Sequence, residues 1–268
     1  MHQSGVKGGN QMNLFDLTGK KAIVTGGARG IGEALAKALG AYGADVAVNY
    51  TSAKDRADGV AAAIQAMGRE AFSIQADVSD EADVERMTAE VMDRFGRIDI
   101  LINNAGIIFG GGVEDYPLDH WKRTFAVNVE GVFLCSKHVG RQMIAQKGGA
   151  IVNIGSMSGK IVNWPFRHAA YNATKAAVHQ FTKNLAVEWA EHNIRVNAIA
   201  PGYIRTELVD DVLAKDPAVL TDHWGKDTIM GRIGETSELA GAVVWLCSDS
   251  ASFTTGEVVF IDGGLTLR

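Results

Sequence analysis

Short runs of apolar, mostly β-branched residues alternate along this chain with longer segments in which apolar residues recur every third or fourth position. The first run covers residues 22–25, and the segment 30–42 that follows it places Ile31, Leu35 and Leu39 on one face. Short apolar runs are typical of strands buried on both faces, and the longer spacing is typical of amphipathic helices. This opening therefore predicts a strand followed by a helix.

The same unit recurs to the end of the chain. Predicted strands cover residues 22–25, 46–49, 71–75, 98–102, 150–154, 195–200 and 258–261. Predicted helices cover residues 30–42, 55–67, 81–95, 119–144, 169–191 and 237–246. Since parallel strands need crossover connections, the alternation predicts an α/β fold, a single-domain Rossmann-type doubly wound parallel sheet of about seven strands flanked by helices.

Two segments fall outside this alternation. Residues 1–13 are polar and glycine-rich, and we expect them to form an N-terminal tail outside the fold. Residues 203–234 are long for a connection, which is typical of a substrate loop or lid. Because the chain has four prolines and no low-complexity linker, residues 14–268 are expected to form one domain.

Composition argues against several function classes. The net charge of −5 over 268 residues gives no basic surface that would favour nucleic acid or an anionic membrane. No stretch approaches the ~18 apolar residues of a membrane span. The two cysteines and seven histidines are scattered without ligand spacing, so no metal site is predicted and a reducing, cytoplasmic location is expected.

A glycine-rich turn joins the first predicted strand to the first predicted helix. Gly26 gives the turn backbone freedom, Gly30 allows a pyrophosphate to approach, and Gly32 lets the helix pack on the sheet. The N–H groups at the start of the helix, around Ile31, would bind the phosphates. This strand–turn–helix context predicts a dinucleotide site and not merely a structural turn.

The second predicted strand bears on the choice of cofactor. It ends in Asn49, Tyr50, Thr51 and Ser52. An NAD enzyme would place a carboxylate there, on the ribose 2′-hydroxyl. Instead, Arg29 and Lys54 could donate hydrogen bonds to a 2′-phosphate, together with Thr51 and Ser52. We therefore expect NADP as the cofactor; use of NAD, with Arg29 merely solvated, is the alternative.

Tyr171 and Lys175 are spaced to lie on one face of a helix. A cation one turn away and a positive nicotinamide ring would both lower the pKa of the phenol from about 10. The pair follows the predicted strand 150–154, and ligands bind at the carboxyl ends of strands in such sheets. This placement predicts proton-transfer chemistry rather than an ordinary surface pair.

These motifs together resemble the short-chain dehydrogenase/reductase family. The glycine turn, the sequence Asn-Asn-Ala-Gly at 103–106, the Tyr171/Lys175 pair and Pro201-Gly202 occur in that family's order, from about residue 17 onward. The resemblance implies that Tyr171 is the general acid/base and that Lys175 holds the nicotinamide ribose and lowers the pKa of Tyr171. It also implies that Asn128 supports a proton relay, although Asn128 could instead only cap or kink its helix.

Further cofactor contacts are implied by the same resemblance. They are Asp77, Val78, Asn104, Pro201, Gly202, Ile204 and Thr206. Asp77 could instead only cap the following turn. A serine after the fifth predicted strand is also implied, to hydrogen-bond the substrate oxygen. Spacing to the tyrosine favours Ser158, whereas the position directly after the strand favours Ser156. We expect Ser156 to be catalytic and Ser158 to line the pocket, with the reverse assignment left open.

Within that family, the run 156–163 with Pro165 resembles the sugar-alcohol and ketose branch. Phe166 and His168 are expected at the substrate, and Arg167 and His168 would either bind an acidic sugar or face solvent. We therefore expect hydride transfer between NADP(H) and the secondary alcohol or ketone of a sugar, polyol or related small molecule.

Two alternatives stay open, reduction of a 3-oxoacyl thioester and, in a different class, a catalytically silent NADP-sensing regulator. The intact proton-transfer residues argue against the regulator, and the missing basic cluster argues against an acidic carrier protein. Apolar residues on more than one face of helix 169–191, together with the resemblance, predict a homotetramer.

Overall fold

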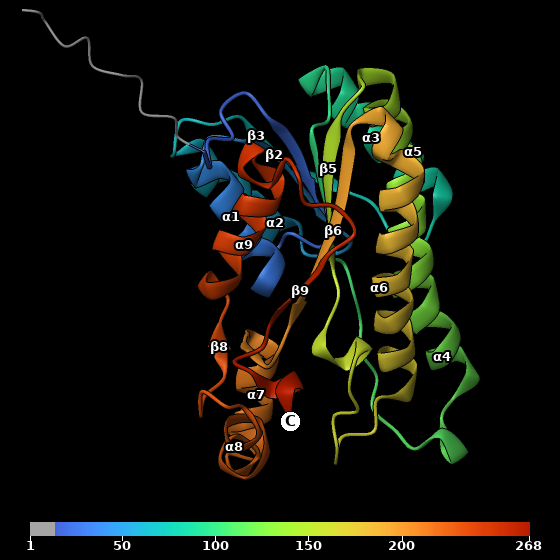
Figure 1. Cartoon of the computed structure of the whole chain (residues 1–268), viewed down its shortest axis with the longest axis vertical. Helices are drawn as coiled ribbons and strands as arrows, with labels where there is room; N and C mark the ends of the chain where they lie inside the picture. Colours follow the sequence, from blue (N-terminus) through green and yellow to red (C-terminus); the bar gives the residue numbers. More distant parts are fainter. Residues whose placement is uncertain (1–13) are drawn as a thin grey trace, which may run out of the picture.

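The computed structural model describes residues 14–268, and its centre is a seven-stranded parallel sheet (Figure 1). The strands are β1 (Lys21–Val24), β2 (Asp45–Tyr50), β3 (Ala71–Gln75), β4 (Ile100–Asn103), β5 (Gly149–Ile154), β6 (Ile194–Pro201) and β9 (Val258–Ile261). Their order is β3-β2-β1-β4-β5-β6-β9, so the predicted doubly wound α/β sheet is confirmed. The expected tail, residues 1–13, lies outside the described residues.

Helices cover both faces of the sheet (Figure 1). One layer consists of α1 (Gly30–Ala41), α2 (Lys54–Gln65) and α9 (Ser237–Cys247). The other contains α3 (Glu81–Phe95), α5 (Gly131–Gln146) and α6 (Ala169–Trp189). In β1, Ala22 and Val24 pack into the first layer and Ile23 into the second. Successive strand residues face opposite sides, which is why a strand between two helical layers is apolar throughout.

The strand order changes direction between β1 and β4, which pair side by side. From β1 the sheet continues to β2 and β3, and from β4 it continues to β5, β6 and β9. In open parallel sheets, ligands bind at the carboxyl ends of the strands where the order reverses. The fold therefore directs attention to the loops that follow β1, β4 and β5.

The predicted helix 119–144 is interrupted in the structure. It consists of α4 (Leu118–Phe125), a π-helical segment (Ala126–Glu130) and α5, which follow one another without a break in the chain. Segments of this kind often occur at functional sites, and this one carries Asn128, a predicted site residue.

The stretch 203–234, predicted to be irregular, is largely ordered into short elements. They are β7 (Ile204–Arg205), α7 (Glu207–Lys215), a π-helical segment (Leu220–Trp224), α8 (Gly225–Asp227) and β8 (Gly234–Glu235). Val219, Trp224 and Ile233 form a small core of their own here, against which part of α7 packs. We call residues 203–234 the lid segment.

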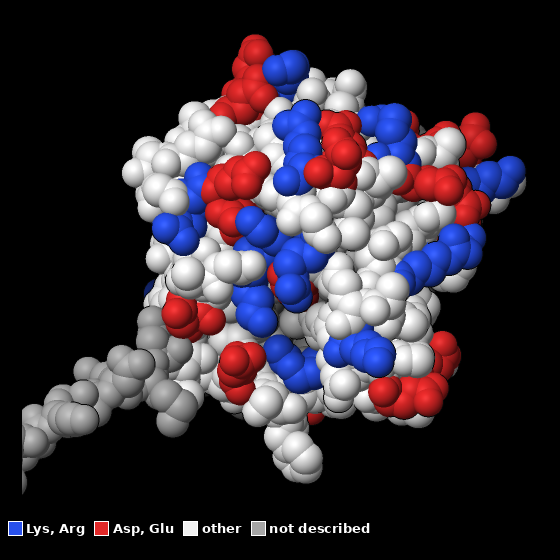
Figure 2. All heavy atoms as spheres, turned by 90° about the horizontal axis from the view of Figure 1, so that it is seen from above, with Lys and Arg blue, Asp and Glu red and all other residues white. Residues whose placement is uncertain are grey.

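The surface and helices add two observations. Figure 2 views the end of the molecule opposite α7 and α8, where basic and acidic side chains are intermixed. Among residues 14–268, no helix has both the length and the apolar character needed to cross a bilayer.

Candidate active site

The glycine turn between β1 and α1 has a backbone that only glycine adopts readily. Gly26 and Gly30 have φ angles of +61° and +56°. A Cβ atom on Gly32 would lie 2.3 Å from the carbonyl oxygen of Gly26, so no larger residue fits there. Arg29, the exposed N-cap residue of α1, makes no side-chain capping bond. The first N–H groups of α1 therefore have no intrahelical partner, and the turn fits a pyrophosphate.

Asn104 holds this turn against the end of β4. Its Nδ2 atom donates hydrogen bonds to the carbonyl oxygens of Thr25 and Gly26, at 2.9 and 3.1 Å. The Thr25 hydroxyl accepts a hydrogen bond from the Asn104 N–H at 2.9 Å. Asn104, predicted as a cofactor contact, thus uses its side chain to fix the shape of the site.

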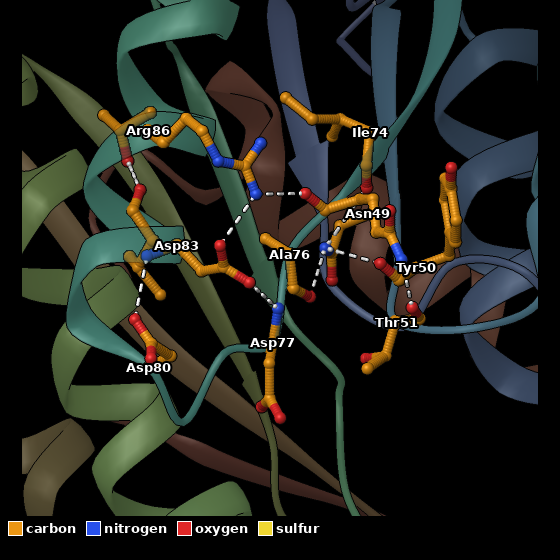
Figure 3. A network of polar contacts seen from close by, with 12 residues as sticks. Asn49, Tyr50, Thr51, Ile74, Ala76, Asp77, Asp80, Asp83 and Arg86 are labelled. Carbon is orange, nitrogen blue, oxygen red and sulfur yellow. Dashed lines mark hydrogen bonds and ion pairs between the residues drawn. The ribbon is translucent and has the colours of Figure 1, made fainter.

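Asn49, predicted as a cofactor contact, lies at the end of β2. Its side chain is buried, and its Oδ1 accepts a hydrogen bond from the Gly26 N–H at 3.1 Å. Its Nδ2 donates to the carbonyl oxygens of Ile74 and Ala76 at 3.3 and 3.1 Å, as Figure 3 shows. The side-chain amide of Asn49 is therefore hydrogen-bonded to the backbone and helps to shape the glycine turn. Tyr50 is also buried, whereas Thr51 and Ser52 are exposed.

Asp77 follows β3 and caps the turn after it. Its Oδ1 accepts hydrogen bonds from the N–H and hydroxyl of Ser79, at 2.9 and 2.6 Å, and its Oδ2 accepts one from Arg123 at 2.9 Å. Burial raises the pKa of the Asp77 carboxyl, but these hydrogen bonds outweigh it and hold the pKa below its usual value. The geometry matches the capping alternative, and the neighbouring Val78 is buried.

β5 and α6 bring the predicted proton-transfer residues together. Lys175 is 5% exposed, and its Nζ donates a hydrogen bond of 2.7 Å to the carbonyl oxygen of Ile154 at the end of β5. The same Nζ lies 5.5 Å from the centre of the Tyr171 ring. Burial lowers the pKa of Lys175 to about 8. Burial raises the pKa of Tyr171, and a hydrogen bond with the Ser156 side chain works against that rise.

The two candidate serines occupy different positions around this tyrosine. Ser156 directly follows β5, and its Oγ accepts a hydrogen bond from the Ser158 N–H at 3.1 Å. The hydroxyl hydrogen of Ser156 thereby remains available as a donor. Ser158 is buried in the next turn. Contact with the phenol favours Ser156 as the residue that binds the reacting oxygen.

Asn128 joins three elements at the back of the site. Its side chain is buried, accepts a hydrogen bond from the Ile107 N–H at 2.8 Å and donates one to the Ile107 carbonyl oxygen at 2.9 Å. It also donates to the hydroxyl of Thr174, next to Lys175, at 3.2 Å. Asn128 therefore ties the π-helical segment to the loop after β4 and to α6.

The lid segment begins beside the glycine turn. Thr206 caps α7, and a Cβ atom on Gly30 would lie 3.5 Å from its methyl group. Pro201 and Ile204 are buried. A Cβ atom on Gly202 would lie 2.7 Å from the Cα of Asp262, so the chain leaves β6 in close contact with the end of β9.

Two aromatic residues of the lid segment were missed by sequence reasoning. Trp224 stacks on Tyr203 with 5.0 Å between ring centres and lies 5.8 Å from the ring of Phe166. Phe166, predicted at the substrate, thus makes an aromatic contact between the β5–α6 loop and the lid segment. The signal available in the sequence was that Tyr203 and Trp224 are the two large aromatic residues of residues 203–234.

The remaining predicted substrate residues lie beside Phe166. His168 stacks with Phe166, and burial lowers the pKa of His168. Arg167 donates to the Glu114 carboxylate at 2.7 Å. Residues 14–268 contain no cluster of three or more metal-ligating side chains.

Comparison with known proteins adds relatives of several kinds. A family model described as enoyl-(acyl carrier protein) reductase matches residues 26–266. The chain is 44% identical to a galactitol 2-dehydrogenase from Rhizobium johnstonii, over 94% of this chain and 97% of that protein. It is 39% identical to a 3-oxoacyl-(acyl-carrier-protein) reductase from Synechocystis, over 94% of this chain and 98% of that protein. A gluconate 5-dehydrogenase from Burkholderia cenocepacia, solved in complex with NADP and tartrate, superimposes with a TM-score of 0.89 at 37% identity, covering 95% of this chain and 98% of the other.

Proposed function

Because this chain belongs to the short-chain dehydrogenase/reductase family, we propose that it interconverts a secondary alcohol and a ketone of a sugar or polyol with NADP(H). The observation that carries this proposal is the meeting of Tyr171, Ser156 and Lys175 at the carboxyl end of β5. The bound nicotinamide supplies or accepts the hydride. The protein itself has to orient the carbon–oxygen bond and move one proton.

Each of the three side chains has a distinct part in that proton transfer. In reduction, Tyr171 donates its phenolic proton to the carbonyl oxygen, and in oxidation the phenolate removes the hydroxyl proton. Ser156 donates a hydrogen bond to the same oxygen and so fixes its position. Lys175 would hold the ribose and, when charged, stabilises the phenolate. Asn128 is hydrogen-bonded to Thr174. It thereby supports α6 next to Lys175, on the side by which the phenolic proton would leave the site.

Charge around the substrate side supports an uncharged polyol over a sugar acid. Arg167, the nearest cation to Phe166 in the chain, is paired with Glu114. Burial lowers the pKa of His168, so its imidazole is neutral at neutral pH. In the lid segment, Arg205 lies within 4.0 Å of two carboxylates and Arg232 is paired with Glu238. These three arginines are therefore already paired with carboxylates of the chain.

The surroundings of the ribose support NADP. Arg29 is exposed beside the glycine turn, and the exposed Thr51 and Ser52 follow β2 with no carboxylate among them. The gluconate 5-dehydrogenase, which is 37% identical to this chain, was solved in complex with NADP. We therefore assign Arg29 to the 2′-phosphate.

The experiment is an absorbance assay of purified protein with NADPH and NADH against neutral polyols and ketoses, sugar acids, and 3-oxoacyl thioesters. We expect turnover of a neutral ketose or polyol with a lower KM for NADPH than for NADH. Arg29→Ala should raise the KM for NADPH about 10-fold and leave NADH nearly unchanged, since one charge-assisted contact is lost. Equal losses for both coenzymes would exclude the assignment of Arg29.

A second candidate function is reduction of a 3-oxoacyl thioester, favoured by the 39% identity to the Synechocystis reductase. The same assay separates the two. A kcat/KM for a 3-oxoacyl thioester that exceeds the value for every polyol would replace the polyol proposal.

We also propose that the chain assembles as a homotetramer. A groove of about 450 Å³ between α5 and α6 is lined by aromatic and aliphatic side chains, including Phe133, Phe181 and Trp189. Charges of both signs, from Lys137, Arg141 and Glu188, line it too. Such a patch can meet its own copy across a two-fold axis.

A further inference from the structure

His179 lies on α6 one turn after Lys175, and the loop that carries the candidate serines wraps around its ring. The side chain is 8% exposed. A Cβ atom on Gly155 would lie 2.3 Å from the imidazole Nε2, and a Cβ atom on Gly159 would lie 2.6 Å from Cε1. The two glycines that bracket the loop therefore leave room for this imidazole, which no side chain at either position would do.

The imidazole also binds the backbone of the proposed catalytic serine. The Ser156 N–H donates a long hydrogen bond of 3.4 Å to Nε2 of His179. The preceding N–H, from Gly155, donates to the carbonyl oxygen of Ile199 on β6 at 2.8 Å. These two hydrogen bonds hold the backbone at Gly155 and Ser156, the two residues that directly follow β5. Nε2 can accept this hydrogen bond only through an unprotonated lone pair, so the contact requires the neutral ring with its proton on Nδ1.

The groups packed around His179 keep the ring neutral. Burial lowers its pKa to about 4, and the charges of Lys175 and Lys183 on the same helix add to this effect. From β9, the Phe260 ring meets the imidazole edge-on at 5.9 Å, and the Lys160 ammonium lies 4.8 Å from the centre of that ring. Within residues 14–268, no carboxylate lies within ion-pair distance of His179.

We propose that His179 is a positioning residue that fixes Ser156 in the active site by accepting its backbone N–H and filling the space between Gly155 and Gly159. The inference rests on the proposed function, because it presumes that Ser156 binds the reacting oxygen. His179 acts on the reaction only through Ser156 and touches neither substrate nor cofactor.

The first test compares His179→Leu with His179→Gln, using the substrate found in the assay above. Leucine fills the space but cannot accept the N–H, and we expect kcat to fall about 10-fold, as for a lost hydrogen bond. Glutamine offers an acceptor near the position of Nε2 and should keep kcat within about 3-fold of the wild type. Affinity for NADPH, from fluorescence quenching, should not change in either variant.

His138 provides a matched control. It is the other buried histidine of residues 14–268, it lies on α5, and its ring pairs with Glu81 at 3.1 Å, away from the serine loop. His138→Leu should leave kcat unchanged. A kcat for His179→Leu equal to the wild type, or an equal fall in His138→Leu, would overturn the proposal.

A double-mutant cycle separates this inference from the function on which it rests. Ser156→Ala alone should lower kcat, and adding His179→Leu to it should lower kcat no further, because the two act as one unit. If Ser156→Ala leaves kcat unchanged, the proposed role of the serine fails. If Ser156→Ala lowers kcat but the two losses multiply, the serine role stands and the positioning role of His179 is excluded.

A pH profile covers the case in which His179→Leu does not fold. Protonation turns Nε2 from an acceptor into a donor, so wild-type kcat should fall as the pH drops through about 4. Initial rates are measured at each acid pH, immediately after transfer of the protein to it. The fall in kcat should be absent in His179→Gln, whose amide does not titrate. The same acid limb in both proteins would count against the proposal.

Discussion

Burial and neighbouring groups act on the Tyr171 phenol in opposite directions. Burial raises its pKa, and contact with Ser156 lowers it. The net effect is a raised pKa, so the phenol is protonated at neutral pH when no cofactor is bound, which suits proton donation in reduction. Oxidation requires the phenolate, which the Lys175 ammonium and a positively charged nicotinamide would both stabilise.

This balance leads to a prediction about pH and direction. For the wild type, the oxidation rate should rise with pH, whereas the reduction rate should be flat until the phenol ionises and fall above that point. Tyr171→Phe removes the phenolic proton that is transferred to the substrate oxygen, so kcat should fall about 10²–10⁴-fold while NADPH affinity stays near the wild-type value. In Lys175→Ala the oxidation limb should move to higher pH and NADPH affinity should drop. Initial rates in both directions, with fluorescence titration of NADPH, measure these quantities.

Tyr42→Phe is the matched control, since Tyr42 is an exposed phenol at the end of α1. Its kcat should equal that of the wild type. Wild-type turnover in Tyr171→Phe on every substrate tested would rule out the assignment of Tyr171.

The sequence predicts which residues are at the site better than it predicts which groups their side chains contact. Tyr171 and Lys175 were predictable because a helix brings residues four apart onto one face. Asn49 was not, because a polar residue at a strand end can face a ligand or its own backbone. The choice depends on the carbonyl oxygens of Ile74 and Ala76, which lie beyond β2 on the neighbouring strand and loop. His179 was missed for the same reason, since its contact glycines lie more than a helix turn away along the chain.

At the scale of elements, the sheet was predictable, whereas the short helices and strands within residues 203–234 were not. All seven strands carry apolar runs because both faces are covered, and the sequence shows this directly. The π-helical segment (Ala126–Glu130) adds one residue to a turn, a change too small to disturb the apolar spacing on either side. α7 spans only Glu207–Lys215, and its apolar side chains pack on the small lid core rather than on the sheet. Its hydrophobic pattern is therefore short, and its apolar side chains are only partly buried.

The lid core yields a prediction about Phe166. Its ring joins the β5–α6 loop to Trp224 and to His223, whose ring lies 5.7 Å away. Phe166→Ala removes the aromatic contact between the two elements, so the KM for the sugar or polyol should rise about 10-fold, with a smaller change in kcat. Steady-state kinetics with saturating NADPH give both constants.

Trp164→Ala serves as the comparison, because Trp164 is on the same loop and 74% exposed. It should behave as the wild type. A rise in KM of the same size in both variants would show a general effect of the loop, not a contact with the lid.

At the scale of the whole molecule, the groove between α5 and α6 predicts assembly. Phe133 is 48% exposed at its edge, a large apolar surface for an isolated chain. Light scattering at micromolar concentration should give four times the monomer mass. Phe133→Glu should shift the protein toward smaller species, because it buries a charge in an apolar contact.

Ala62→Glu is the control, since Ala62 is a small exposed residue of α2 that does not line the groove. It should leave the mass unchanged. A monomeric wild type would contradict the assembly prediction without affecting the catalytic one.

The strand order has a consequence for how such a protein can change over time. β1, β2 and β3, with the exposed residues expected to distinguish the two coenzymes, all come from one half of the sheet and the earlier part of the chain. Ser156, Tyr171 and the lid segment come from the later part. Recombination of two related genes near β4 would therefore exchange coenzyme preference and leave the choice of substrate intact. The ion pair between Arg56 on α2 and Glu207 on α7 is a contact that crosses this boundary, and because it is exposed its loss would cost little stability.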